Sequence, residues 1–338
     1  MMQPAGFPAP TGRTNAARDG RGRLFGAFVM IAALVFGAPS QADDALSVVA
    51  TTGMIADAAR EIGGESVSVR ALMGAGVDPH SYRQTRSDIV ALVQADLVLS
   101  HGLYLEAQME EFLRRLSTRQ TVVAVAETLS RERLLGHADY ENKFDPHVWM
   151  DPAMWSDVVL AIRDALTEVR PAEGEGFARR AQAYLAEIEK LGRYAEAATE
   201  TVPEDSRVLL TAHDAFAYFG RAYAFEVIGI QGISTESEAG LRRISDLVDL
   251  LVERDISAVF VESSVPERNV RALVEGAASR GQDVRVAGTL YSDAMGAPGT
   301  YEGTYLGMID HNVTTIVRAL GGQAPAQGMA GRLGEGGP

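Results

Sequence analysis

Histidine is the residue type in this sequence whose spacing most clearly indicates chemistry. The chain has six histidines in 338 residues, and two of them lie in the same tripeptide, Asp78-Pro79-His80 and Asp145-Pro146-His147. Proline fixes its own φ and keeps the preceding residue extended, so each tripeptide presents its histidine from a stiff loop. Such a histidine could act as a metal ligand, a general base or a turn residue. The repeated context favours a joint role for the two.

Two further side chains would complete a set of metal ligands. His213 follows the apolar run at 207–211, and Asp293 follows the apolar run at 284–290. Successive members of the set His80, His147, His213 and Asp293 are 67, 66 and 80 residues apart, so only tertiary structure could join them. Three imidazoles and one carboxylate form a full set of ligands for a divalent transition metal. Tetrahedral coordination would suit Zn²⁺, whereas a bidentate aspartate would suit Mn²⁺ better.

The composition excludes several other kinds of chemistry. The chain contains no cysteine, so thiolate zinc sites, disulfides, iron–sulfur clusters and lipidation on cysteine are ruled out. The net charge is −14 and no basic patch occurs, which argues against nucleic-acid binding. The length and the hydrophobic fraction of 46% are sufficient for two domains with substantial cores.

The N-terminus has the pattern of an export signal. Four arginines precede the apolar run Leu24–Gly37, and Ser40-Gln41-Ala42 offers small residues at a cleavage point. The run is 14 residues long, too short for a typical membrane-spanning helix. We therefore predict a signal peptide at 1–42 and a soluble periplasmic protein. Removal of the signal peptide takes away four arginines and one aspartate, so the net charge of the mature chain would be −17.

Apolar runs and amphipathic segments alternate along the rest of the chain. This order predicts an α/β fold with two lobes, each a mostly parallel sheet flanked by helices. The predicted strands are 46–50, 67–71, 96–100, 121–125, 207–211, 225–230, 259–262 and 284–290. The predicted helices are 54–62, one around 89–93, 103–116, 153–169, 176–200, 242–254, 267–280 and 305–320.

The long amphipathic segment at 176–200 divides this pattern. We interpret it as one rigid helix that joins the two lobes. The predicted domains are a signal peptide at 1–42, an N-terminal lobe at 43–170, the connecting helix at 171–202, a C-terminal lobe at 203–320 and a flexible tail at 321–338, which is rich in Gly, Ala and Pro. Ligands of such sheets bind outside the carboxyl ends of the strands, where His80 is expected.

Characteristic stretches occur between about residue 46 and residue 320. They are Asp78-Pro79-His80 with Tyr82, Ala95-Asp96-Leu97-Val98, Asp145-Pro146-His147-Val148-Trp149-Met150-Asp151-Pro152, Thr211-Ala212-His213-Asp214-Ala215-Phe216, Gly232-Ile233-Ser234-Thr235, Val261-Glu262-Ser263-Ser264-Val265-Pro266 and Tyr291-Ser292-Asp293-Ala294-Met295-Gly296. Together they resemble the metal-binding cluster A-I, TroA-like solute-binding proteins, which serve ABC importers of zinc and manganese. The resemblance covers nearly the whole predicted mature chain.

The resemblance implies His80, His147, His213 and Asp293 as the metal ligands and two α/β lobes joined by a long helix. It also implies a binding protein without enzymatic activity, which captures Zn²⁺ or Mn²⁺ between the lobes and delivers it to an ABC permease with its ATPase. We expect a monomer that could also meet a periplasmic metallochaperone. The stiff connector should limit closure to small tilts or loop ordering.

Two departures bear on which metal is carried. Many zinc-specific relatives have a long loop rich in His, Asp and Glu before the second histidine, whereas this region holds only His137, Asp139, Glu141 and Asp145. Manganese-specific relatives often have a carboxylate at the position of His213. Because the imidazole favours zinc, we favour zinc, with manganese a close second.

Two other functions compete with metal capture. An exported zinc hydrolase would need three ligands and an open water position, with Asp293 as a free base. An adhesin built on the same fold would not need the histidines at all.

The remaining candidate residues have more ordinary roles. We expect His101 and His311 to pack at the surface or behind the ligands, and His137 to be solvated in its loop. Glu262 could orient a ligand histidine, but pairing with Arg242 or Arg243 is the safer interpretation. Trp149 and Trp155 are expected in the core or the cleft wall.

Overall fold

The first half of the chain forms a parallel sheet of four strands in a computed structural model, which describes residues 45–137 and 141–334. The strand order is β2-β1-β3-β4. The bounds are Leu46–Ala50 for β1, Val67–Ala71 for β2, Leu97–Ser100 for β3 and Val122–Ala124 for β4. β1 pairs with both β2 and β3, so that Val48 lies opposite Val69 and Leu97. The predicted strands and their parallel arrangement are confirmed.

The second half contains two parallel strand pairs. β5 (Val208–His213) pairs with β6 (Glu226–Gln231), and β7 (Ala258–Glu262) pairs with β8 (Arg285–Leu290). β5 also contacts β7, so these four strands lie next to one another. The carboxyl ends of β5 and β7 therefore meet, and His213 and Glu262 are their last residues.

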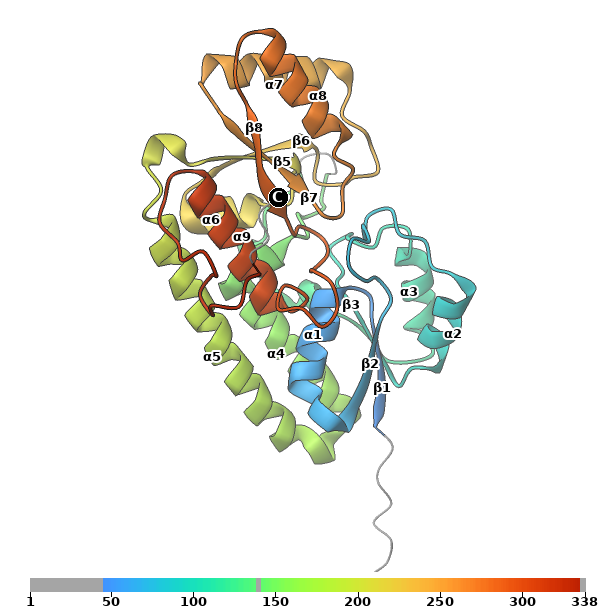
Figure 1. Ribbon diagram of the computed structural model, residues 1–338. Coiled ribbons are helices and arrows are strands. Elements are labelled where there is room, and N and C mark those ends of the chain that lie inside the picture. Colours follow the sequence, from blue (N-terminus) through green and yellow to red (C-terminus); the bar gives the residue numbers. More distant parts are fainter. Residues whose placement is uncertain (1–44, 138–140, 335–338) are drawn as a thin grey trace, which may run out of the picture. The chain divides into compact units, whose positions relative to one another are not determined.

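Helices cover these strands (Figure 1). Their bounds are Gly53–Gly63 for α1, Arg86–Gln94 for α2, Glu110–Leu116 for α3, Pro152–Val169 for α4, Gly174–Thr199 for α5, Ala217–Tyr223 for α6, Leu241–Glu253 for α7, Arg268–Ser279 for α8 and Tyr305–Ala319 for α9. Among the described residues, none of these helices has the length and apolar character needed to cross a membrane. The predicted signal peptide at 1–42 lies outside the described part of the chain.

The long helix α5 is the predicted connector, and it follows the first sheet and precedes the second in the chain. It spans 26 residues, and Phe177, Tyr184, Ile188 and Leu191 are buried along one face. That face packs against α1, α4 and α9 (Figure 1). Asp57 joins α1 to α5 and α9. Its Oδ2 accepts a hydrogen bond from the Tyr184 hydroxyl of α5 (3.2 Å) and another from the Tyr305 N–H of α9 (2.9 Å).

The apolar core does not stop at the predicted boundary between the lobes. α9 belongs by sequence to the C-terminal half, yet its Met308 and Ile309 share one buried cluster with β1, α1, α4 and α5. Residues of α6 join the same cluster. The division of the chain at 170 and 203 therefore stays a prediction.

Two parts of the predicted helix pattern were wrong. The helix predicted at 103–116 begins only at Glu110, because Gly102, Leu103 and Tyr104 all have positive φ. The buried Glu106 carboxylate supports this turn by accepting the backbone N–H groups of His101 and Gly102 at 2.7 and 3.1 Å. The short helix α6 had not been predicted.

Residues 321–334, the described part of the predicted flexible tail, lie against α9, and the flexibility of the tail stays a prediction. The buried Asp310 of α9 accepts the backbone N–H groups of Met329 (2.8 Å) and Ala330 (3.3 Å). Leu333 is buried as well. A buried carboxylate is stabilised by accepting such hydrogen bonds. The same bonds hold the tail in place, although its small residues have little apolar surface to bury.

Candidate metal centre

The loop after β2 presents His80. The Asp78 side chain accepts the backbone N–H of His80 at 2.9 Å, a local bond that closes a turn around Pro79. His80 is 3% exposed, so the turn directs the imidazole inward. This is the stiff loop that the tripeptide predicts.

The second tripeptide repeats this turn and adds a bond to the ring. Asp145 Oδ1 accepts both the backbone N–H and the Nδ1–H of His147, at 2.9 and 2.7 Å. The ring therefore presents Nε2, the nitrogen that a metal would use. Next along the chain, Asp151 caps α4 by accepting the N–H of Ala153 at 2.9 Å, and Pro152 begins the helix. This cap fixes where the loop ends.

His213 owes its orientation to a neighbouring strand. Because β5 and β7 lie side by side, Glu262 at the end of β7 reaches His213 at the end of β5. Its Oε1 accepts the backbone N–H at 2.9 Å and its Oε2 accepts Nδ1–H at 2.5 Å. Both side chains are fully buried. Glu262 thus orients a ligand-type histidine, and the safer interpretation, pairing with Arg242 or Arg243, was wrong.

Asp293 lies in the loop that follows β8. Its Oδ2 accepts a long hydrogen bond from Ser264 Oγ, at 3.3 Å. The preceding residue, Ser292, accepts the indole N–H of Trp149 at 2.8 Å. Trp149 comes two residues after His147, so this bond joins the loop of Asp293 to the loop of His147.

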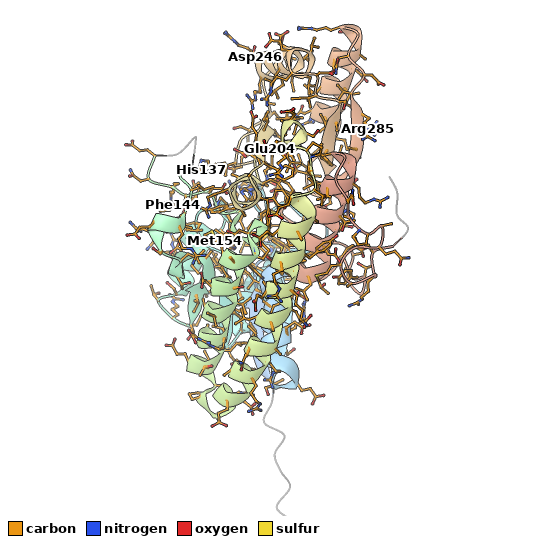
Figure 2. The ribbon with its side chains drawn as sticks, turned by 90° about the vertical axis from the view of Figure 1, so that its left-hand side faces the viewer. His137, Phe144, Met154, Glu204, Asp246 and Arg285 are labelled. Carbon is orange, nitrogen blue, oxygen red and sulfur yellow. The ribbon has the colours of Figure 1, made fainter. Side chains whose placement is uncertain are left out.

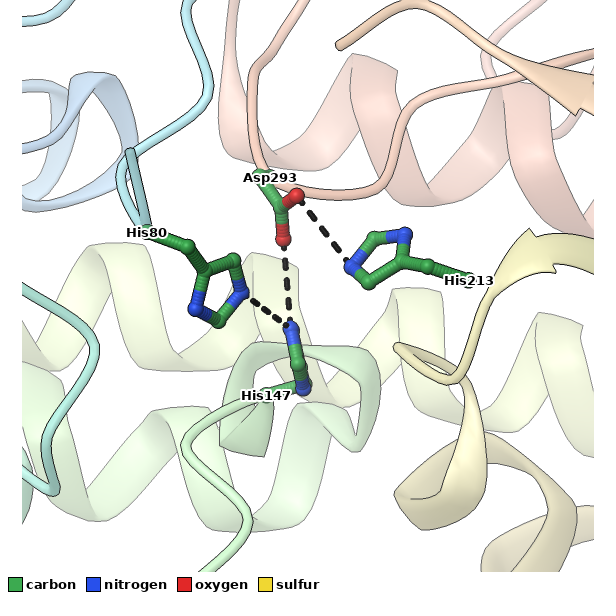
Figure 3. Close-up of side chains that lie close together, drawn as sticks. All are labelled: His80, His147, His213 and Asp293. Carbon is green, nitrogen blue, oxygen red and sulfur yellow. Dashed lines mark hydrogen bonds and ion pairs between the residues drawn. The ribbon is translucent and has the colours of Figure 1, made fainter. Parts of the chain in front are cut away.

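The four predicted side chains meet at one point (Figure 3). One donor atom from each of His80, His147, His213 and Asp293 lies within 4.8 Å of the others. His147 Nε2 is 3.3 Å from His80 Nε2 and 3.2 Å from Asp293 Oδ1, and His213 Nε2 is 3.2 Å from Asp293 Oδ2. None of the four is more than 3% exposed. We call these four residues the His₃Asp cluster.

The charges of the cluster are strongly coupled. Burial opposes protonation of His147, but the Asp145 and Asp293 carboxylates outweigh it and raise its pKa to about 9. For His213, burial is likewise outweighed by Asp293 and Glu262, which raise its pKa well above the usual range. Burial opposes ionisation of Asp293, yet the neighbouring imidazoles hold its pKa well below the usual range. Burial dominates at His80 and lowers its pKa to about 3.

The donor atoms fit a divalent transition metal. Buried polar atoms normally have hydrogen-bond partners, but His213 Nε2 and Asp293 Oδ1 have no hydrogen bond in this structure. Both atoms belong to the cluster and face its other members (Figure 3). An ion bound to three imidazole nitrogens and one carboxylate would satisfy them, and two of the imidazoles already have the carboxylate partners that metal-binding histidines usually have.

The other histidines lie outside the cluster. His101 is fully buried, and its Nε2–H donates to the Pro146 carbonyl at 2.7 Å. It therefore packs behind the loop of His147, which is one of the two positions expected for it. His311 is half-buried and donates to the Thr289 carbonyl at 2.9 Å. Trp149 and Trp155 are fully buried, as predicted.

His137 lies at one end of the polar loop before His147. Its backbone N–H donates to the Lys143 carbonyl at 2.9 Å, and Gly136 pairs with Phe144, so the two ends of this loop lie together (Figure 2). His137 is half-buried, and its solvation in the loop stays a prediction. Of the loop's acidic residues, Asp139 lies outside the described part of the chain.

This fold, with its parallel strands and one long helix, is the fold of metal-binding substrate-binding proteins of ABC importers. The family model described as zinc-uptake complex component A, periplasmic, matches residues 48–319, and the chain belongs to this family.

Curated relatives cover nearly the full chain. The manganese-binding lipoprotein MntA of Bacillus subtilis is 46% identical over 297 residues, which are 88% of this chain and 97% of that relative. The zinc-binding protein TroA of Treponema pallidum is 46% identical over 286 residues, 84% of this chain and 92% of that protein.

Solved structures agree with the fold. The periplasmic zinc-binding protein TroA from Treponema pallidum superposes with a TM-score of 0.80 at 45% identity and covers 82% of this chain and 99% of its own. Fe(III)-bound YtgA from Chlamydia trachomatis reaches a TM-score of 0.75 at 29% identity, with the same coverage of both chains. The predicted family and fold class are therefore confirmed.

Proposed function

We propose that this protein captures a divalent transition metal ion with His80, His147, His213 and Asp293 and delivers it to an ABC permease. The observation that carries the proposal is the convergence of four buried donor atoms, from three loops and the end of β5, within 4.8 Å of one another. Relatives of nearly equal similarity are described as manganese-binding and zinc-binding.

Binding without catalysis is the second part of the proposal. A hydrolytic zinc centre keeps one position open for water and needs a base beside it. Here the acidic residue that could act as that base, Asp293, lies between two imidazoles, 3.2 Å from His147 Nε2 and from His213 Nε2. A carboxylate in this position is suited to close the coordination shell. The family consists of substrate-binding proteins, which also favours capture over the hydrolase and adhesin alternatives.

Zinc remains the favoured ion and manganese the close second. Three imidazoles are typical of a zinc site, whereas a bidentate aspartate would extend the shell toward manganese. In this proposal the protein is a periplasmic monomer whose signal peptide at 1–42 is cleaved. Its partners are an inner-membrane permease with its ATPase and, in addition, a metallochaperone.

Elemental analysis of the protein purified from its native compartment tests the function directly. We expect about one equivalent of zinc or manganese for each chain, and a competing chelator should give one binding site in titration. Protein with the ions removed should regain one equivalent on addition of Zn²⁺. Substoichiometric binding that the chelator removes at micromolar concentration would contradict the proposal, because a fully built four-ligand site binds far more tightly.

The proposed ligands should make metal affinity depend on pH. Burial lowers the pKa of His147, but Asp145 and Asp293 outweigh this effect and raise the pKa to about 9. The imidazole is therefore protonated at neutral pH in the metal-free protein. The ion must displace that proton, and also the one on His213. The apparent affinity should therefore rise with pH, by up to about tenfold per unit for each displaced proton, and the part of this rise that is due to His147 should level off above about pH 9.

Calorimetry in two buffers of different ionisation enthalpy would count the protons released at pH 7. We expect about one to two for each Zn²⁺ bound. An affinity that stays constant between pH 6 and pH 8 would show that these imidazoles are already neutral and that the proposed electrostatics are wrong.

A further inference from the structure

The two Asp-Pro-His tripeptides share one contact and differ in another. In both, the aspartate Oδ1 accepts the backbone N–H of the histidine at 2.9 Å. Asp145 uses that oxygen a second time, for Nδ1–H of its own histidine. Asp78 instead uses its second oxygen, Oδ2, which accepts the hydroxyl groups of Ser81 at 2.8 Å and of Thr235 at 2.6 Å.

The Thr235 contact spans a large distance along the chain. Thr235 lies 157 residues after Asp78, in the loop between β6 and α7. A second bond reaches the same loop from the turn before α3, because Gln108 donates to Glu236. The loop that carries Asp78 also lies against the segment after β7, where a Cβ placed on Gly76 would be 3.5 Å from the Ser263 carbonyl oxygen. The His80 loop is therefore held between segments of the second half of the chain.

The chain supports the three histidines unequally. His147 and His213 are each fixed through Nδ1–H by a fully buried carboxylate, Asp145 or Glu262. For His80, the nearby aspartate fixes only the backbone N–H, and Asp78 itself is only partly buried. The position of His80 thus depends on where its loop lies, and the Thr235 hydroxyl is one of the groups that fix that loop.

We propose that Asp78 is a positioning residue that couples the loop at 232–238 to His80, so that the Thr235 hydroxyl slows release of the bound ion. This inference rests on the proposed function of the His₃Asp cluster. When the loop at 232–238 moves away, Asp78 loses one of its two partners at Oδ2 and the His80 loop becomes free to withdraw its imidazole. Asp78 does not contact the ion and acts only through His80.

The test compares variants that remove single hydroxyl groups from the same carboxylate oxygen. Thr235→Val removes the distant partner at nearly constant volume, Thr235→Ser keeps the hydroxyl, and Ser81→Ala removes only the local partner. Zn²⁺-loaded protein is mixed with excess chelator, and the dissociation rate is followed by stopped flow. We expect about a three- to tenfold faster rate for Thr235→Val, from the loss of one partly exposed, charge-assisted bond. Thr235→Ser should stay near the wild-type rate, and Ser81→Ala should raise the rate less than Thr235→Val does, because the bond to the loop at 232–238 remains.

Hydrogen exchange supplies a readout that a purely structural role would not change. Zn²⁺ should protect the backbone amides of residues 232–238 in the wild-type protein, and Thr235→Val should lose this protection while the thermal midpoint of the metal-free variant stays within about 2 °C of wild type. A Thr235→Val dissociation rate equal to wild type would overturn the coupling alone. His80→Ala tests the underlying function separately, because wild-type Zn²⁺ affinity in that variant would contradict the ligand set itself.

Discussion

Replacing Asp293 by alanine should lower Zn²⁺ affinity more than about 100-fold, since even residues behind metal ligands contribute about 10- to 100-fold. Asp293 is the only carboxylate in the His₃Asp cluster, and it lies 3.2 Å from both His147 Nε2 and His213 Nε2. Its loss removes one ligand and the negative charge that offsets the ion. Competition with a fluorescent chelator at pH 7.5 would measure the change.

The matched control is Asp283→Ala, because Asp283 is exposed just before β8, the strand that leads to Asp293. This variant should bind Zn²⁺ like the wild type. The pair of variants also separates capture from catalysis. If Asp293→Ala kept one tightly bound Zn²⁺ and lost a hydrolytic activity that the wild type possesses, Asp293 would be a base and the protein an enzyme.

Replacing Glu262 by glutamine should lower Zn²⁺ affinity about 10- to 100-fold without removing any ligand. Glu262 accepts both the backbone N–H and the Nδ1–H of His213, at 2.9 and 2.5 Å. Glutamine has only one oxygen to replace these two acceptors, and it lacks the charge that makes the imidazole a stronger donor of its electron pair to a metal. Both side chains are fully buried, so bulk solvent cannot reach the lost acceptor position.

The pH dependence of this loss provides a sharper test. Burial lowers the pKa of His213, but Asp293 and Glu262 outweigh this effect and raise the pKa above its usual range. The wild-type protein must therefore displace a proton from His213 to bind the ion. In Glu262→Gln the pKa of His213 falls, so protons compete less strongly with the metal ion for this imidazole. The affinity ratio between wild type and variant should therefore be larger at pH 9 than at pH 7. Glu253→Gln, which changes an exposed glutamate on α7, should leave the affinity unchanged at both values.

The strands and most of the helices could be predicted because their signals are local. The apolar run at 46–50 and the alternation at 67–71 indicate strands by themselves, and both have the predicted bounds. The helix prediction for 103–116 was wrong over its first residues, for a physical reason that the hydrophobic periodicity does not reveal. Leu103 and Tyr104 adopt positive φ because Glu106, a buried carboxylate, takes the neighbouring N–H groups and holds a turn in place of the first helical turns.

The side chains that can bind a metal could be recognised from the sequence, because residue chemistry and the stiffness of Asp-Pro-His are local properties. The order of strands and helices could also be predicted, and it places His80, His147, His213 and Asp293 in loops or at the end of a strand. The carboxylate that supports His213, by contrast, depends on how the strands pack. Asp145 reaches His147 within one turn, but Glu262 reaches His213 only because β5 and β7 lie side by side. The Asp78–Thr235 contact likewise depends on packing between segments 157 residues apart, which no local pattern encodes.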